Sequence, residues 1–140
     1  MCSSDLAQAG ARFLQLQICY HPDRLERFCA GVAQYVPGLA LLPTIVLVKG
    51  PRPLHFMNDK VPGIDVPADQ IARVEGAADK AEAAYQQTLE IARHALAQPG
   101  VRGLHVTDFR GDDTLERLMT ELGRTRTTIE HREDTHAHSA

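Results

Sequence analysis

The sequence predicts an α/β fold in which helices pack outside a sheet of parallel strands. Short apolar segments alternate with helical patterns along the chain, as in βαβ units. Residues 39–48 (LALLPTIVLV) form a continuous apolar run, which is typical of a strand covered on both faces. A whole helical pattern separates this run from the preceding strand, so no antiparallel hairpin joins the two.

Composition indicates one ordinary soluble domain. The chain has 140 residues, of which 44% are hydrophobic and 24% charged, and its net charge is −3. This charge, without a basic stripe, argues against nucleic-acid binding. No apolar run approaches the roughly 20 residues that span a bilayer. The three cysteines (Cys2, Cys19 and Cys29) lack metal-type spacing. We therefore expect a reduced, cytoplasmic setting with Cys19 and Cys29 as small hydrophobes; a catalytic thiol is the alternative.

Both chain ends are expected to lie outside the fold. Residues 1–6 are interpreted as a non-native leader, because CSSDL resembles the translation of a sequencing-library adapter. Residues 124–140 are polar, lack periodicity and predict a disordered tail. The tail contains His131, His136 and His138, and we predict solvated side chains there rather than a metal site.

The first strand is predicted at residues 12–19, and its two faces differ in character. Side chains alternate along a strand. One face is apolar apart from an arginine and carries Arg12, Leu14, Leu16, Ile18 and Tyr20. The other carries Phe13, Gln15, Gln17 and Cys19. An amide face without charges suggests that Gln15 and Gln17 look into an enclosed polar space, where a ligand could be their partner. The alternative is that they bond to each other, to water or to neighbouring backbone.

The next elements follow from apolar periodicity and breakers. Residues 7–10 should end a helix, with Gly10 as its C-cap. A helix opens at Pro22 and carries an apolar stripe until Pro37 and Gly38 stop it. The strand at 39–48 follows.

The middle of the chain predicts a loop and then two helices. Two prolines within residues 49–53 favour a rigid loop through residue 59 rather than a long helix. Residues 61–67 predict a turn and an extended step. Helices are predicted at 67–74 and at 77–98, where small alanines permit close packing on a sheet.

The last unit has a third strand at 101–107, a polar loop and a helix ending at Gly123. Asp113 and Glu116 resemble an acidic capping box at the start of that helix. Three parallel strands alone leave two open edges. A (β/α)8 barrel needs roughly 250 residues, so this chain would supply under half of its strands.

Four motifs together carry a resemblance to a known family. They are Gly10-Ala11 with Leu16-Gln17 and Phe28, FMNDKVPGI at residues 56–64, Val66-Pro67, and PGVRGLH at residues 99–105. Over residues 7–123 the chain resembles the C-terminal part of methylenetetrahydrofolate reductase.

The resemblance implies a (β/α)8 barrel that holds FAD over the carboxyl ends of its strands, the three strands here being the last three. The implied reaction passes hydride from NADH or NADPH through FAD to methylenetetrahydrofolate, giving methyltetrahydrofolate. The catalytic acid and most FAD contacts belong to the first half of the barrel, which the resemblance implies is missing from this chain. No catalytic residue is therefore expected here, and the chain alone should bind little flavin.

The resemblance also assigns candidate binding residues. Gln17 matches a glutamine that hydrogen-bonds folate or nicotinamide, with Gln15 as a structural candidate one step deeper. Met57, or Phe56 beside it, falls where an apolar side chain meets the ligand. Phe109 could replace another apolar contact.

Two further candidates come from the last strand and the loop after it. His105 matches a histidine there, with a satisfied core histidine as the default, and Arg110 could supply a nearby cation.

Departures from the family pattern leave alternatives open. Pro53 replaces an expected glutamine, and residues 106–111 (VTDFRG) differ from the usual sequence. A divergent barrel paralogue acting on another pterin or one-carbon substrate, with a deazaflavin, is one alternative. A non-catalytic barrel module that needs a partner chain is the other. A homo-oligomer is a further expectation for the full-length protein.

Overall fold

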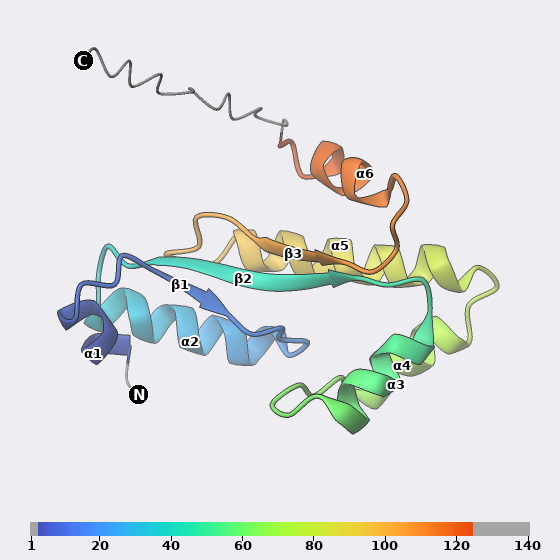
Figure 1. Cartoon of the computed structure of the whole chain (residues 1–140), viewed down its shortest axis with the longest axis horizontal. Helices are drawn as coiled ribbons and strands as arrows, with labels where there is room; N and C mark the ends of the chain where they lie inside the picture. The colour runs from blue at the N-terminus through green and yellow to red at the C-terminus, as the bar shows by residue number, and fades with distance from the viewer. Residues whose placement is uncertain (1–2, 125–140) are drawn as a thin grey trace, which may run out of the picture.

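The computed structural model describes residues 3–124, and its elements alternate as the sequence predicts (Figure 1). They are α1 (Ser3–Gln8), β1 (Phe13–Leu16), α2 (Pro22–Tyr35), β2 (Ala40–Leu47), α3 (Pro51–Lys60), α4 (Ala68–Glu75), α5 (Lys80–Leu96), β3 (His105–Asp108) and α6 (Thr114–Glu121). The predicted leader contributes residues 3–6 to α1. The predicted tail beyond Arg124, with its three histidines, lies outside the described residues.

The three strands form one parallel sheet in the order β1-β2-β3, which confirms the α/β class. The register places Leu14 opposite Leu41, and Ile45 opposite Val106. Both outer strands have four residues and are shorter than predicted. The start of the third predicted strand makes only an isolated bridge, from Val101 to β2.

Within β1 the two faces of the sheet separate as the predicted alternation requires. The prediction is wrong beyond Leu16, where the strand ends: Ile18 and Tyr20 pack in the cluster that holds Val46 and Val48, and Cys19 packs with Leu14 and Leu16. Leu14, Leu16 and Leu41 pack with α2 in one core cluster. Ile45 and Leu47 pack against α5 and α6 in another. The helices α2 and α5 thus cover the same face, and Figure 1 shows α2 running beside β1 and α5 behind β3.

The described residues cover the opposite face only in part, because Val46 is buried there in a cluster with residues of α3 and α4, whereas the face is open near the start of β1. By the same alternation it carries Phe13, Gln15, Leu42, Thr44, His105 and Thr107. Phe13 and Gln15 are exposed, and Phe13 retains 58% of its accessible surface. Gln15 therefore faces away from α2 and α5 as predicted, but residues 3–124 do not enclose the space in front of it.

Helix ends follow local chemistry. Gly10 ends α1 with a φ of 100°, a left-handed value that suits glycine, and confirms the predicted C-cap. Its N–H donates to the Ala7 carbonyl, and the N–H of Ala11 donates to Leu6. Pro22 opens α2, where a missing N–H costs no helical hydrogen bond.

The structure corrects the predicted loop at residues 49–59. Residues 51–60 form the ten-residue helix α3. Pro51 and Pro53 both lie in its first turn, where backbone N–H groups have no intrahelical partner in any helix. The prolines therefore start this helix instead of preventing it.

The predicted capping box of α6 is also wrong. Asp113 occupies the N-cap but its side chain makes no capping bond. Asp112 takes this role, because its Oδ1 accepts from the Thr114 N–H at 3.0 Å. A cap that the sequence reading missed occurs at α5, where the Asp79 side chain accepts from the Glu82 N–H.

A third core cluster lies beyond the carboxyl ends of the strands. Val46 and Val48 meet Leu54 and Met57 of α3 there, together with residues of α4. Asn58 fixes the connecting loop by bonding both the N–H and the carbonyl of Val66. This cluster anchors α3 over the strand ends. No helix within residues 3–124 is long and apolar enough to cross a membrane.

Candidate functional site

A pocket of about 600 Å³ lies at the carboxyl ends of the three strands. Its walls come from the residues that follow β1 and β2, from β3 and the residue after it, and from α3 with its following loop. The lining residues are Gln17, Ile18, Val48, Arg52, Pro53, Phe56, Met57, Val61, Ile64, Thr107 and Phe109. In parallel α/β folds ligands bind at this end of the sheet.

Gln17 brings the amide group of the pocket. It directly follows β1 and is exposed. Its Oε1 accepts from the N–H of Ile18 at 3.1 Å. Its Nε2 donates to no other residue among those described, so this donor is free for a ligand. The alternative, in which the amide bonds to neighbouring backbone, is therefore correct for Oε1 but not for Nε2.

Two phenylalanines reach the pocket from opposite parts of the chain. Phe56 lies on α3 and Phe109 follows β3. Both are large apolar side chains left 60% and 68% exposed, respectively. Exposed aromatic side chains at a concave site provide flat surfaces for a planar ligand.

Met57 differs from its neighbour Phe56. It lines the pocket but retains only 6% exposure and belongs to the core cluster beneath α3. Its position shows core packing and is compatible with the ligand contact that the sequence left open.

The pocket contains few other polar groups. Thr107 is on β3 and Arg52 is in the first turn of α3. No carboxylate lines the pocket. An apolar cavity with a small number of polar groups is the usual composition of a small-molecule site.

Gln15 and His105 do not line this pocket. Gln15 shares the uncovered face but lies two residues deeper in β1. His105 begins β3, at the end of the strand away from the pocket, and is exposed. Its Nδ1 lies 3.4 Å from the Thr44 hydroxyl. The expectation of a buried histidine with a hydrogen-bond partner is therefore half correct. His105 has a partner in Thr44, but its side chain is exposed.

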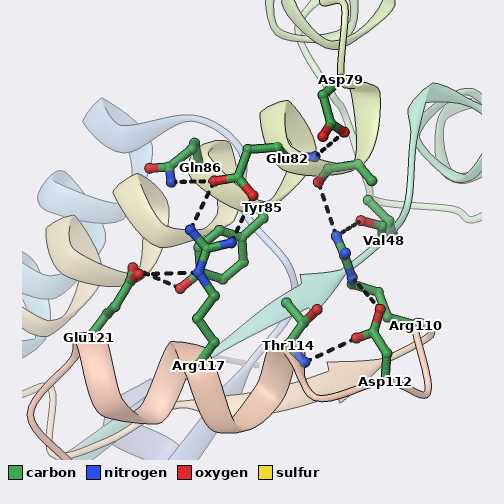
Figure 2. A network of polar contacts seen from close by, with 11 residues as sticks. Val48, Asp79, Glu82, Tyr85, Gln86, Arg110, Asp112, Thr114, Arg117 and Glu121 are labelled. Carbon is green, nitrogen blue, oxygen red and sulfur yellow. Dashed lines mark hydrogen bonds and ion pairs between the residues drawn. The ribbon is translucent and has the colours of Figure 1, made fainter.

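Arg110 is turned away from the pocket, although the sequence offered it as a ligand cation. Its guanidinium donates to the carbonyls of Val48 at 3.2 Å and Ala81 at 3.0 Å (Figure 2). The same group pairs with Asp112 at 3.3 Å. These contacts fasten the loop after β3 to the end of β2 and to α5. Arg110 therefore supports the segment that carries Phe109.

A polar network that the sequence did not reveal joins α5 to α6 (Figure 2). Arg117 donates to both carboxylate oxygens of Glu82, at 2.7 and 2.8 Å, and to Glu121 at 3.2 Å. Hydrogen bonds from Arg117, and then from Gln86, lower the pKa of Glu82 to about 2. Burial, followed by the bond to Glu121, raises the pKa of Tyr85 to about 12.

Both cysteines pack as small hydrophobes, as the sequence predicts, although Cys19 lies on the helix-covered side and not on the predicted glutamine face. Cys29 is fully buried in the cluster between α2 and the sheet, and Cys19 packs against it. Burial raises the pKa of the Cys29 thiol, and the neighbouring Cys19 adds to this effect. The described residues contain no group of three His, Cys, Asp or Glu side chains that could hold a metal ion.

Fold and site together define an α/β protein with a small-molecule pocket at the carboxyl end of a parallel sheet. The sequence of residues 5–123 matches the family described as methylenetetrahydrofolate reductase. The chain therefore belongs to the methylenetetrahydrofolate reductase family. No curated protein matches the chain.

Membership sets the general expectation for fold and activity. The family domain is a TIM barrel, and the three-stranded parallel sheet is consistent with part of one. The family implies an oxidoreductase that acts on folate substrates and is generally flavin-dependent.

Proposed function

We propose that this chain is the C-terminal part of a flavin-dependent methylenetetrahydrofolate reductase and forms a substrate-facing wall of its barrel. In this proposal the pocket receives the ring of the folate or of the nicotinamide. Gln17 hydrogen-bonds the ring edge, while Met57 and Phe109, with Phe56, contact its face.

One observation supports this proposal most directly. Gln17, Met57 and Phe109 come from three segments that are far apart in the sequence, yet they line one pocket. The pocket lies at the sheet end where barrel active sites are built. A pterin ring presents both donors and acceptors at its edge, and the free Nε2 of Gln17 can serve an acceptor.

The uncovered face supports the fragment interpretation. In the described residues β1 and β3 pair on one side only, since β2 lies between them. Their outer edges present unpaired backbone groups, which natural sheets usually cover or close into a barrel. Further strands would also cover Phe13 and the polar residues beside it.

If the chain is the C-terminal part of the barrel, the cofactor contacts are shared between this chain and the rest of the barrel. Bound FAD would supply the hydride carrier between NAD(P)H and the folate. The residues present offer apolar faces, one amide, one hydroxyl and one guanidinium, which suit a planar heteroaromatic ring. Flavin positioning and the proton donor are assigned to the part of the barrel outside this chain.

The test is a binding titration of the purified chain with 5-methyltetrahydrofolate, comparing the parent protein with Gln17→Ala. We expect the affinity to fall by about 1–3 kcal/mol, the cost of an unpaired polar contact. Gln15→Ala is the matched control, because Gln15 shares the face but not the pocket. Equal affinity of the parent and Gln17→Ala would contradict the proposed role.

A divergent substrate is the second candidate. Arg110, the cation expected near the ligand, is occupied by backbone carbonyls, and Pro53 stands where a glutamine is expected. These changes favour a paralogue with altered recognition of the part of the ligand beyond its ring. Titration with other reduced pterins decides between the candidates, since tighter binding of one of them than of the folate would favour the paralogue. The third alternative, a non-catalytic module, predicts binding without turnover when a partner chain is supplied.

A further inference from the structure

We propose that Arg52 binds an oxyanion on the arm of the ligand, so that the pocket selects a planar heteroaromatic ring carrying a carboxylate or phosphate. This inference rests on the proposed function, because it extends the same pocket. The positive charge that meets the ligand then comes from Arg52 on α3, and not from Arg110 in the loop after β3.

The first support is the free charge of Arg52. Arg52 lines the pocket and is exposed. Within residues 3–124 its side chain makes no salt bridge or hydrogen bond, and no acidic side chain lines the pocket. Arg110, by contrast, donates from its Nε to Asp112 and from its Nη1 to the carbonyls of Val48 and Ala81. A ligand anion would therefore meet Arg52 without displacing an existing partner.

The second support is helical spacing. Arg52 and Phe56 are four residues apart on α3, so they lie on one face of the helix, and both line the pocket. A ring placed against Phe56 directs a substituent along this face toward the guanidinium. The planar guanidinium can hold a carboxylate or a phosphate with two parallel hydrogen bonds.

The third support is the chemistry of the helix start. Pro51 and Pro53 flank Arg52 and carry no backbone N–H. A helix N-terminus usually binds anions through such N–H groups. Here two of the first three are missing, and the side chain of Arg52 becomes the main donor at this point.

The experiment compares ligands with and without the anionic arm on the intact chain. The first pair is 5-methyltetrahydrofolate and 6-methyltetrahydropterin. The second pair is reduced nicotinamide mononucleotide and reduced nicotinamide riboside. Each is titrated into the parent chain, Arg52→Gln, Arg52→Lys and the control Lys49→Gln, which removes a nearby exposed charge that does not line the pocket.

We expect Arg52→Gln to weaken binding of the arm-bearing ligand about tenfold and to leave the bare ring unchanged, as for a lost charge-assisted hydrogen bond. Arg52→Lys should restore part of the affinity, and Lys49→Gln should match the parent. The pair that shows the loss identifies the anion as carboxylate or phosphate.

Three results would overturn the inference. The first is that arm-bearing ligands bind Arg52→Gln as tightly as they bind the parent. The second is that Arg52→Gln loses as much affinity for the bare ring as for the arm-bearing ligand, and the third is that Lys49→Gln loses as much affinity as Arg52→Gln. If no ligand of either pair binds the parent chain, the proposed function itself fails, and the inference fails with it.

Discussion

The guanidinium of Arg117 on α6 lies over the ring of Tyr85 on α5, with 3.9 Å between its central carbon and the ring centroid. The hydroxyl of Tyr85 donates to Glu121 at 2.8 Å, so one tyrosine contacts α6 through both its ring and its oxygen. Because α6 follows the loop that carries Phe109, this clamp holds a wall of the candidate site against α5.

Tyr85→Phe should destabilise the protein by about 1 kcal/mol, because it removes one hydrogen bond to a carboxylate and keeps the ring. The free energy of unfolding in urea measures the effect. Tyr35→Phe is the control, since Tyr35 is 75% exposed and its change should be negligible. A destabilisation of Tyr35→Phe equal to that of Tyr85→Phe would contradict the clamp.

Stability should fall in acid because two carboxylates have depressed pKa values. The pKa of Glu82 is lowered to about 2 by Arg117 and then Gln86, and that of Asp112 to about 2 by Thr114. Their ordinary values are 4.5 and 3.8. A depressed native pKa stabilises the folded state above the ordinary value, and this stability disappears as pH falls toward the native one.

We therefore predict a nearly constant urea midpoint from pH 7 to 5, then a decline between about pH 4.5 and 2. Glu82→Gln should be less stable than the parent at pH 7, and its stability should fall less steeply in acid. An unchanged acid slope in Glu82→Gln would remove Glu82 from this explanation.

Met57 and Phe56 are adjacent in sequence but should respond differently to truncation. Met57→Ala should cost roughly 2–4 kcal/mol of stability, because it leaves a cavity in the cluster beneath α3. Phe56→Ala should change stability by less than about 0.5 kcal/mol, since its ring is exposed, yet reduce ligand affinity severalfold. Urea unfolding and ligand titration on both variants provide the comparison. A Phe56→Ala variant as unstable as Met57→Ala would show that Phe56 is a core residue.

The chain alone should bind FAD weakly and show no turnover. The proposal places most flavin contacts in the first half of the barrel, outside this chain. Quenching of flavin fluorescence during a titration measures the affinity. A tight one-to-one complex would mean that these residues form a flavin site by themselves.

Local chemistry explains what the sequence could predict. Alternation in β1 separated Leu14 and Leu16 from Gln15 correctly, because strand side chains must point to opposite faces. The continuous apolar run of β2 correctly predicted a buried strand, although within the described residues the face turned away from α2 and α5 is packed only toward the carboxyl end of β2. The Gly10 cap followed from the freedom of glycine at positive φ.

Contacts between distant segments explain what it missed. Arg110 was a plausible ligand cation from its neighbours, but the carbonyls that occupy it belong to Val48 and Ala81, which only the fold brings near. The bonds of Arg117 to Glu82 span 35 residues and have no local signature. The helix α3 was missed because its prolines were interpreted as breakers, although the first turn of a helix tolerates them.

The most direct test of the proposed ligand site is to map where 5-methyltetrahydrofolate binds on the isotopically labelled 140-residue chain. Backbone and side-chain amide signals in ¹H–¹⁵N spectra report the contact surface. We predict the largest changes at the Gln17 side-chain amide and at the backbone amides of Thr107 and Phe109. Changes confined to the helix-covered side of the sheet, or none at saturating ligand, would contradict it.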